Sequence, residues 1–161
     1  MKFISFNHDN SEKFGIIENN LITDLTGKID GASSLKELIK IKKIKEAKEY
    51  AKSNPGSIKP DQIEYSPLIP NPGKIICVGL NYSEHVKETN RTVEENPVIF
   101  HRFPESQTAH MQAIQRPTVS ESLDFEGEMA VVMDEGGKHI KQEDALKPVS
   151  YTHLRAHETM S

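Results

Sequence analysis

The sequence predicts an α+β fold that is mostly β, and three features of the chain predict it. Short segments with alternating polar and apolar residues fill residues 2–25, and apolar residues with helical spacing fill residues 34–53. Prolines and glycines then crowd residues 55–73, and further strand-like segments follow them. We therefore expect a small N-terminal domain of a β-meander plus a helix over residues 1–66, and a β-rich second domain from residue 67 onward.

Composition narrows the class of protein. The chain has 161 residues, a formal net charge of −4, 35% hydrophobic residues and 27% charged residues. This balance is typical of a folded chain and argues against nucleic acid as a partner. No segment approaches the roughly 18 apolar residues of a membrane span, and the N-terminus lacks the apolar stretch of a signal peptide. The single cysteine, Cys77, lies in an apolar run, where we expect a reduced thiol and a cytoplasmic protein.

The first 25 residues predict a small antiparallel meander. KFISF at residues 2–6 alternates as a strand does, and residues 14–17 and 21–25 give two further apolar segments. Residues typical of turns separate these segments: HDNSEK follows the first, and the pair Asn19 and Asn20 follows the second.

Residues 34–53 predict one amphipathic helix. Ser34 and Glu37 have the spacing of a capping box, and the leucines, isoleucines and alanines form an approximate stripe. The segment holds seven lysines against three glutamates. Two interpretations stay open: a solvated face whose lysine stems cover the stripe, or a surface that holds an anionic partner and makes the protein a non-catalytic binding module.

A first candidate site follows the apolar run KIICVG at residues 74–79, which predicts a buried strand. The sequence continues as LNYSEHVKE, and polar groups at the end of a rigid strand are well placed to form a functional site. If Ser83 caps a short helix, His85 and Glu88 share one face, and the carboxylate orients the imidazole as a general base. The alternative is a surface helix on which the two residues are neighbours by chance.

A second candidate site is the pair of glutamates at the entrance to an apolar run, in the text SLDFEGEMAVVMD. In a strand, Glu126 and Glu128 share one side with Ala130 and Val132, so two carboxylates lead into apolar residues. Solvent exposure, a shared proton or a bound cation would each relieve their repulsion. If the face is buried, a cation relieves it best, and oxygen ligands favour Mg²⁺, Mn²⁺ or Ca²⁺.

Three blocks in order, GKIICVGLNYSEHVKE, NPVIFHRFPES and SLDFEGEMAVVMDEGGKHI, resemble the fumarylacetoacetate hydrolase family over roughly residues 72–149. Residues 1–66 look like the small N-terminal domain of many bacterial members. The resemblance implies that residues 67–149 begin a mixed β-roll catalytic domain, incomplete here, of a usually homodimeric enzyme. It also implies Mg²⁺- or Mn²⁺-dependent chemistry on small oxo- or enol-acids: hydrolysis of acylpyruvates, decarboxylation of oxaloacetate, or isomerisation of dienoic acids.

The resemblance also implies roles for individual residues. Glu126 and Glu128 match the family's Glu-x-Glu motif and are expected to bind the metal, while Asp124 is expected to support them. The remaining positions that it assigns are a catalytic pair, His85 and Glu88, and a basic residue that contacts a substrate carboxylate, Arg102.

The resemblance ends near Val149. Family members continue with a further aspartate, the third metal ligand, and with a long β-rich remainder. Residues 150–161 do not match the sequence of family members, and we expect them to be a sequence artefact such as a translated adapter. His153 and His157 within them are then a chance pair. We expect the 161-residue chain to be an inactive, truncated example of the family with exposed strand edges.

Overall fold

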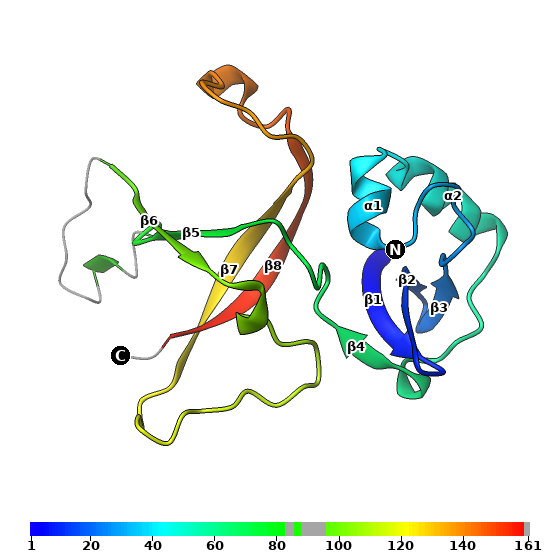
Figure 1. Ribbon diagram of the computed structural model, residues 1–161, viewed down its shortest axis with the longest axis horizontal. Helices are drawn as coiled ribbons and strands as arrows, with labels where there is room; N and C mark the ends of the chain where they lie inside the picture. The colour runs from blue at the N-terminus through cyan, green and yellow to red at the C-terminus, as the bar shows by residue number, and fades with distance from the viewer. Residues whose placement is uncertain (83–85, 88–95, 160–161) are drawn as a thin grey trace.

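The structure is a computed structural model that describes residues 1–82, 86–87 and 96–159. At residues 124–126 and 150–159 it describes the backbone only. The predicted class is confirmed: the fold is α+β and mostly β, with a small N-terminal domain followed by part of a β-roll (Figure 1).

The N-terminal domain contains a four-stranded sheet in the order β3-β2-β1-β4. Its strands are β1 (Lys2–His8), β2 (Ser11–Glu18), β3 (Leu21–Asp24) and β4 (Glu64–Ser66). The first three form the predicted antiparallel meander. Each of its two turns has two residues with positive φ, Asp9 and Asn10 in the first and Asn19 and Asn20 in the second. These are residue types that adopt the left-handed conformation and allow a tight hairpin.

The prediction of a single helix over residues 34–53 is wrong, because the structure has two helices, α1 (Leu35–Lys40) and α2 (Ile44–Ser53). Lys42 lies between them with a φ of 59°. In one straight helix Ala47 would lie about 180° around the axis from Leu38, since each residue turns about 100°. The break re-aims the second helix, so both residues are fully buried against the sheet. Half of the predicted capping box is confirmed: the Ser34 hydroxyl accepts the Glu37 backbone N–H at 3.2 Å, whereas the Glu37 carboxylate accepts the N–H of Ser33 and not that of Ser34.

The core of this domain lies between the sheet and the two helices, which Figure 1 shows side by side next to β1 and β2. Burial of these apolar side chains is the main stabilising contribution, at roughly 25 cal/mol per Å² removed from water. The residues of the cluster are Phe3, Phe14, Ile16, Leu25, Ile29, Ala32, Leu35, Leu38, Ile39, Ala47 and Ala51.

The second part of the chain consists of two hairpins. In the first, β5 (Ile75–Gly79) pairs antiparallel with β6 (Val98–Arg102), and in the second, β7 (Asp124–Met133) pairs with β8 (Val149–Thr159). Residues 150–159, expected from the sequence to lie outside the fold, continue β8 as backbone. Short 3₁₀ turns occupy Pro60–Gln62, Pro104–Ser106 and Gln142–Asp144.

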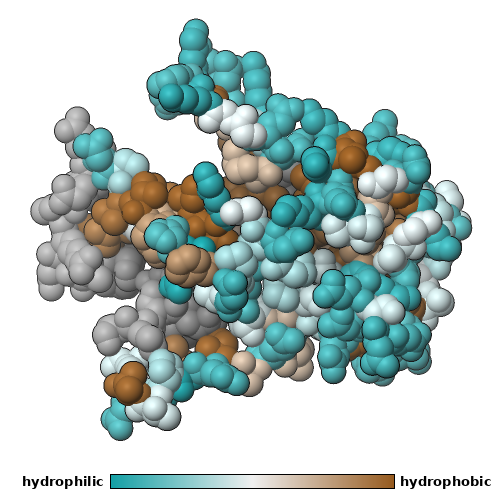
Figure 2. Space-filling view, in the orientation of Figure 1, coloured by the Kyte–Doolittle hydropathy of each residue, from teal (hydrophilic) through white to brown (hydrophobic). Residues whose placement is uncertain are grey.

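The apolar faces of these hairpins are open in the described part of the chain. The strand predicted at residues 74–79 is confirmed, but its full burial is not, because Ile76 is 62% exposed and β5 pairs with β6 alone among the described strands. Figure 2 shows apolar side chains gathered on the side of the molecule where Figure 1 places these hairpins. Among the described residues, no helix is long and apolar enough to cross a membrane.

Candidate functional site

The strand β7 carries the candidate metal ligands, and its exposure alternates as predicted. Glu128, Ala130 and Val132 are half-buried, whereas the residues between them are exposed. The shared face of Glu128 and its two apolar neighbours is therefore confirmed. Glu126 and Asp124 belong to the same strand, but their side chains lie outside the described part of the structure, so their predicted roles stay predictions.

The antiparallel register fixes what lies across the hairpin from this motif. Glu128 is opposite Arg155, and Glu126 is opposite His157. Gly127, between the two glutamates, is exposed, and a Cβ built there would meet no atom of the described residues within 4 Å. The backbone between the two candidate ligands is therefore accessible to a small molecule.

The segment after β5 reaches back to this strand. Leu80 has a positive φ of 53°, which turns the chain at the end of β5. Tyr82 follows, and its phenolic oxygen accepts a hydrogen bond from the backbone N–H of Met129, at 3.1 Å. The Val86 N–H in turn donates to the Tyr82 carbonyl at 3.1 Å, and Val86 is buried. Sequence reasoning missed Tyr82, because no periodicity links two residues that are 47 positions apart.

The candidate catalytic pair, His85 and Glu88, lies outside the described residues, so its predicted role is untested. Arg102, the candidate substrate contact, ends β6 and is half-buried, paired in register with Ile75. Cys77 is half-buried in β5. Arg102 therefore lies beside β5, the strand that precedes Tyr82, and this position does not test contact with a substrate.

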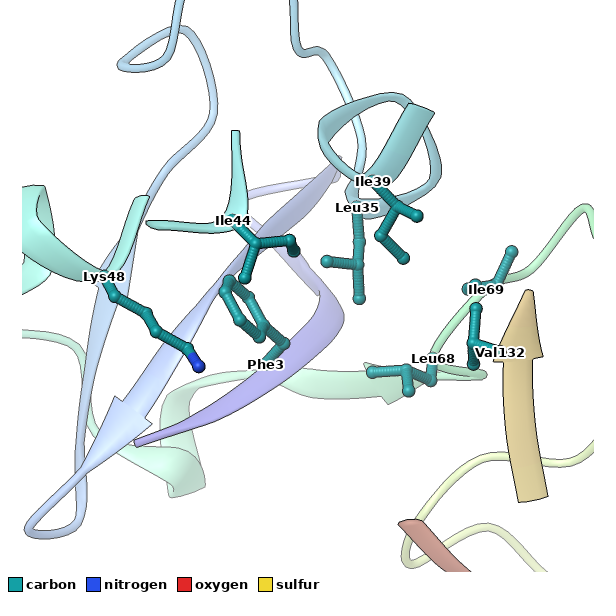
Figure 3. A pocket seen from close by; sticks show the side chains of 8 residues that line it. All are labelled: Phe3, Leu35, Ile39, Ile44, Lys48, Leu68, Ile69 and Val132. Carbon is teal, nitrogen blue, oxygen red and sulfur yellow. The ribbon is translucent and has the colours of Figure 1, made fainter. Parts of the chain in front are cut away.

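The far end of β7 is anchored on the N-terminal domain. Val132 packs against the core cluster and lines a cavity of about 50 Å³ (Figure 3). The figure shows Val132 beside Leu68 and Ile69, which belong to the proline-rich linker. The other lining residues are Phe3, Leu35, Ile39, Ile44 and Lys48.

An ion pair adds to this anchor, between Lys42 and Glu135. The hydrogen bond and charge of Glu135 raise the pKa of Lys42, and those of Lys42 lower the pKa of Glu135. Both side chains are exposed, and such pairs contribute little to stability in water. The apolar contact of Val132 is therefore the main connection here.

Several lysines of residues 34–53 have partners within the chain. Lys36 donates to the Asn71 carbonyl at 2.6 Å, and Lys43 lies 3.4 Å from Glu46. Lys42 has the partner just described. These contacts favour a solvated face over a dedicated surface for an anionic partner.

Among the described residues, no three His, Cys, Asp or Glu side chains gather closely enough to hold a metal ion. The half-buried carboxylate of Glu128 is thus the one proposed metal ligand whose side chain the structure describes.

Comparison with known proteins defines the class to which this arrangement belongs. Residues 74–154, half of the chain, match the family model described as Fumarylacetoacetate (FAA) hydrolase C-terminal. The match includes the first hairpin, β7 with its Glu-Gly-Glu segment and the first part of β8, and it runs five residues beyond the boundary at Val149. The chain belongs to the fumarylacetoacetate hydrolase family.

Two curated relatives are similar over part of their length. The chain is 42% identical over 89 residues to a mitochondrial oxaloacetate tautomerase of Rattus norvegicus, a match that covers 55% of this chain and 28% of that protein. It is 39% identical over 103 residues to a mitochondrial oxaloacetate tautomerase of Xenopus laevis, covering 64% of this chain and 32% of that protein. The chain therefore spans about a third or less of these relatives. Because both are named as mitochondrial, the predicted cytoplasmic location stays a prediction.

A solved structure shares the fold. The maleylpyruvate hydrolase of Sphingobium sp., determined in complex with manganese(II) and pyruvate, superposes with a TM-score of 0.79 over 99% of this chain and 59% of that one. The sequence identity is 18%, so the likeness establishes the fold alone.

Proposed function

We propose that this chain carries part of the active site of a divalent-metal-dependent enzyme that acts on small oxo- or enol-acids. Its family supports this proposal, as do relatives named as oxaloacetate tautomerases and a structural neighbour that holds manganese(II) and pyruvate. Acylpyruvates, oxaloacetate and 2-hydroxy-dienoates belong to this substrate class. Hydrolysis, tautomerisation and decarboxylation are its candidate reactions. We expect a homodimer, as is usual in the family.

The position of Glu128 is the observation that carries the proposal. Its carboxylate is half-buried on a face shared with Ala130 and Val132. A carboxylate on a partly apolar face attracts a cation more strongly than one in bulk water, because the attraction is less screened there. With Glu126 as second ligand, the donor set is one that Mg²⁺ accepts, because Mg²⁺ commonly binds one or two carboxylates together with water and substrate oxygens. Mn²⁺ and Ca²⁺ also prefer oxygen ligands.

The roles of the residues follow from this assignment. When bound, a divalent cation supplies Lewis-acid polarisation of the carboxylate and keto oxygens of a 2-oxo acid. Glu126 and Glu128 would hold the cation, and Asp124 would support them. His85 would take a proton from carbon or from water, with Glu88 keeping its imidazole in the basic tautomer. The substrate-carboxylate contact falls to Arg102.

Glu128→Gln tests the proposal, since it replaces the carboxylate with a neutral group of the same size. We expect the 161-residue chain to bind one Mn²⁺ weakly, as measured by electron paramagnetic resonance of free Mn²⁺, and the variant to bind about tenfold or more weakly. Glu121→Gln, which neutralises an exposed carboxylate just before β7, is the control and should not change affinity. Equal Mn²⁺ affinity in wild type and Glu128→Gln would contradict the proposal.

The activity of the fragment is a separate question. We expect no turnover of oxaloacetate or an acylpyruvate by the 161-residue chain, as followed by ultraviolet absorbance, because the chain spans only about a third or less of the relatives that it matches. Turnover that persists in Glu128→Gln would contradict the metal assignment. Turnover by the wild-type chain that is lost in the variant would support that assignment and contradict the expected inactivity.

A further inference from the structure

Tyr82 connects the two hairpins of the second domain. It lies just after β5, where the positive φ of Leu80 redirects the chain, and it is 44% exposed. Its phenolic oxygen accepts the backbone N–H of Met129 in β7 at 3.1 Å. A phenol can donate as well as accept, but a backbone N–H only donates, so the direction of this bond is certain.

This hydrogen bond acts on the peptide unit that follows Glu128. The carbonyl of Glu128 and the N–H of Met129 belong to one planar group. Holding the N–H therefore restrains the orientation of this plane, and with it the ψ angle of Glu128. Glu128, whose side chain is half-buried on the apolar face, is thus the residue next to the restrained peptide unit.

The environment of β7 makes this single bond important. Among the strands that the structure describes, β7 pairs with β8 alone. In an antiparallel pair, alternate residues direct their N–H groups toward the partner strand and away from it. The Met129 N–H is directed to Tyr82, so the phenol satisfies a donor on the edge where the described structure has no neighbouring strand.

A second bond holds Tyr82 from its own side. The buried Val86 donates its N–H to the Tyr82 carbonyl at 3.1 Å, which restrains the backbone of Tyr82. Tyr82 is thus held by Val86 through its backbone, while its phenol accepts from Met129 of β7.

We propose that Tyr82 is a positioning residue, which sets the orientation of Glu128 through the Met129 N–H. The inference rests on the proposed function of Glu128 as a metal ligand and adds the residue that holds this ligand in place.

Tyr82→Phe removes the acceptor and keeps the ring. Tyr65→Phe is the matched control, because Tyr65 belongs to β4 and contacts His110 through its ring, without a hydrogen bond from its hydroxyl in the described residues. Both variants are made in the 161-residue chain.

The first measurement is amide hydrogen exchange by nuclear magnetic resonance. In Tyr82→Phe the Met129 amide should exchange roughly two- to tenfold faster, which is the effect of one lost hydrogen bond. The second measurement is the carboxyl ¹³C chemical shift of Glu128 without metal, which should move in Tyr82→Phe and stay constant in Tyr65→Phe. Faster exchange with an unchanged Glu128 shift would overturn the inference, as would unchanged exchange.

Mn²⁺ binding separates this inference from the proposed function. We expect the Mn²⁺ affinity to fall several-fold in Tyr82→Phe, less than in Glu128→Gln, and to remain unchanged in Tyr65→Phe. If the wild-type chain binds no Mn²⁺, the proposed function fails, and the two metal-free measurements still decide whether Tyr82 positions Glu128. If Mn²⁺ binds and Tyr82→Phe leaves its affinity unchanged, the inference is overturned while the metal assignment stands.

Discussion

Val132→Ala should lower the free energy of unfolding by about 1 kcal/mol, because Val132 packs against the core of the N-terminal domain. The substitution removes two methyl groups, and a fully buried CH₂ is worth about 0.8 kcal/mol. The side chain is half-buried, so the loss should be well below the full value for two groups. With a urea m-value of about 2 kcal/mol per M, the midpoint should move down by roughly 0.5 M.

Urea unfolding followed by far-ultraviolet circular dichroism measures this change. Val131→Ala is the matched control, since Val131 is the preceding residue of the same strand, points to the other face and is 43% exposed. Val131→Ala should lower the free energy of unfolding by clearly less than Val132→Ala does. A larger effect of Val131→Ala, or equal effects of both substitutions, would show that the strand and not the contact with the domain is responsible.

A double-mutant cycle isolates that contact. Leu68 lines the same cavity as Val132, and Figure 3 shows the two side chains next to each other. Residues in contact typically couple by about 0.5 kcal/mol or more, whereas distant ones add independently. Strict additivity of Val132→Ala and Leu68→Ala would refute the docking of β7 on the N-terminal domain.

Two further predictions concern the N-terminal domain. Burial alone raises the pKa of Asp24, but hydrogen bonds, including that from Lys13, and the charge of Lys13 outweigh it and hold the pKa below its ordinary value. The stabilisation by Asp24 is therefore complete above about pH 4 and is lost as the pH falls through the lowered pKa, so Asp24→Asn should be less stable than wild type at pH 7 in urea unfolding, with a gap that closes below pH 4. Gly15→Ala should destabilise by about 1–3 kcal/mol, because a Cβ there would lie 2.2 Å from the Thr23 carbonyl oxygen, while the control Gly127→Ala meets nothing within 4 Å; equal losses in a thermal-unfolding comparison would contradict this reasoning.

Local pattern predicted most of the elements and failed where the chain changes direction. The turn at Asn19 and Asn20 could be recognised because asparagine tolerates positive φ. The break at Lys42 could not, because helical spacing is a property of a whole segment and the sequence around Lys42 contains no proline or glycine. The incompatible directions of Leu38 and Ala47 on a single helix were the available signal, since their spacing requires a change of axis.

Of the candidate site, the shared face of β7 could be predicted from the sequence, whereas the contacts that hold β7 could not. The face shared by Glu128, Ala130 and Val132 follows from the period of a strand, which needs no knowledge of tertiary structure. The contacts that hold this face do not follow from any period. Tyr82 bonds to a strand residue 47 positions later, and Val132 packs on the N-terminal domain. Both depend on how separate segments meet, which a single sequence does not specify.

The contacts of β7 with Tyr82 and with the N-terminal domain should affect the affinity of Glu128 for a metal ion. Tyr82 holds the peptide at Met129, and Val132 is held on the N-terminal domain only three residues further along. Glu128 therefore lies directly before a stretch of backbone that is fixed on two sides by elements outside its own hairpin. A ligand that is ordered before the cation binds loses less conformational entropy on binding, and its affinity rises accordingly. The N-terminal domain should thus strengthen metal binding at Glu128 without providing a ligand, and Val132→Ala should weaken Mn²⁺ binding where Val131→Ala does not.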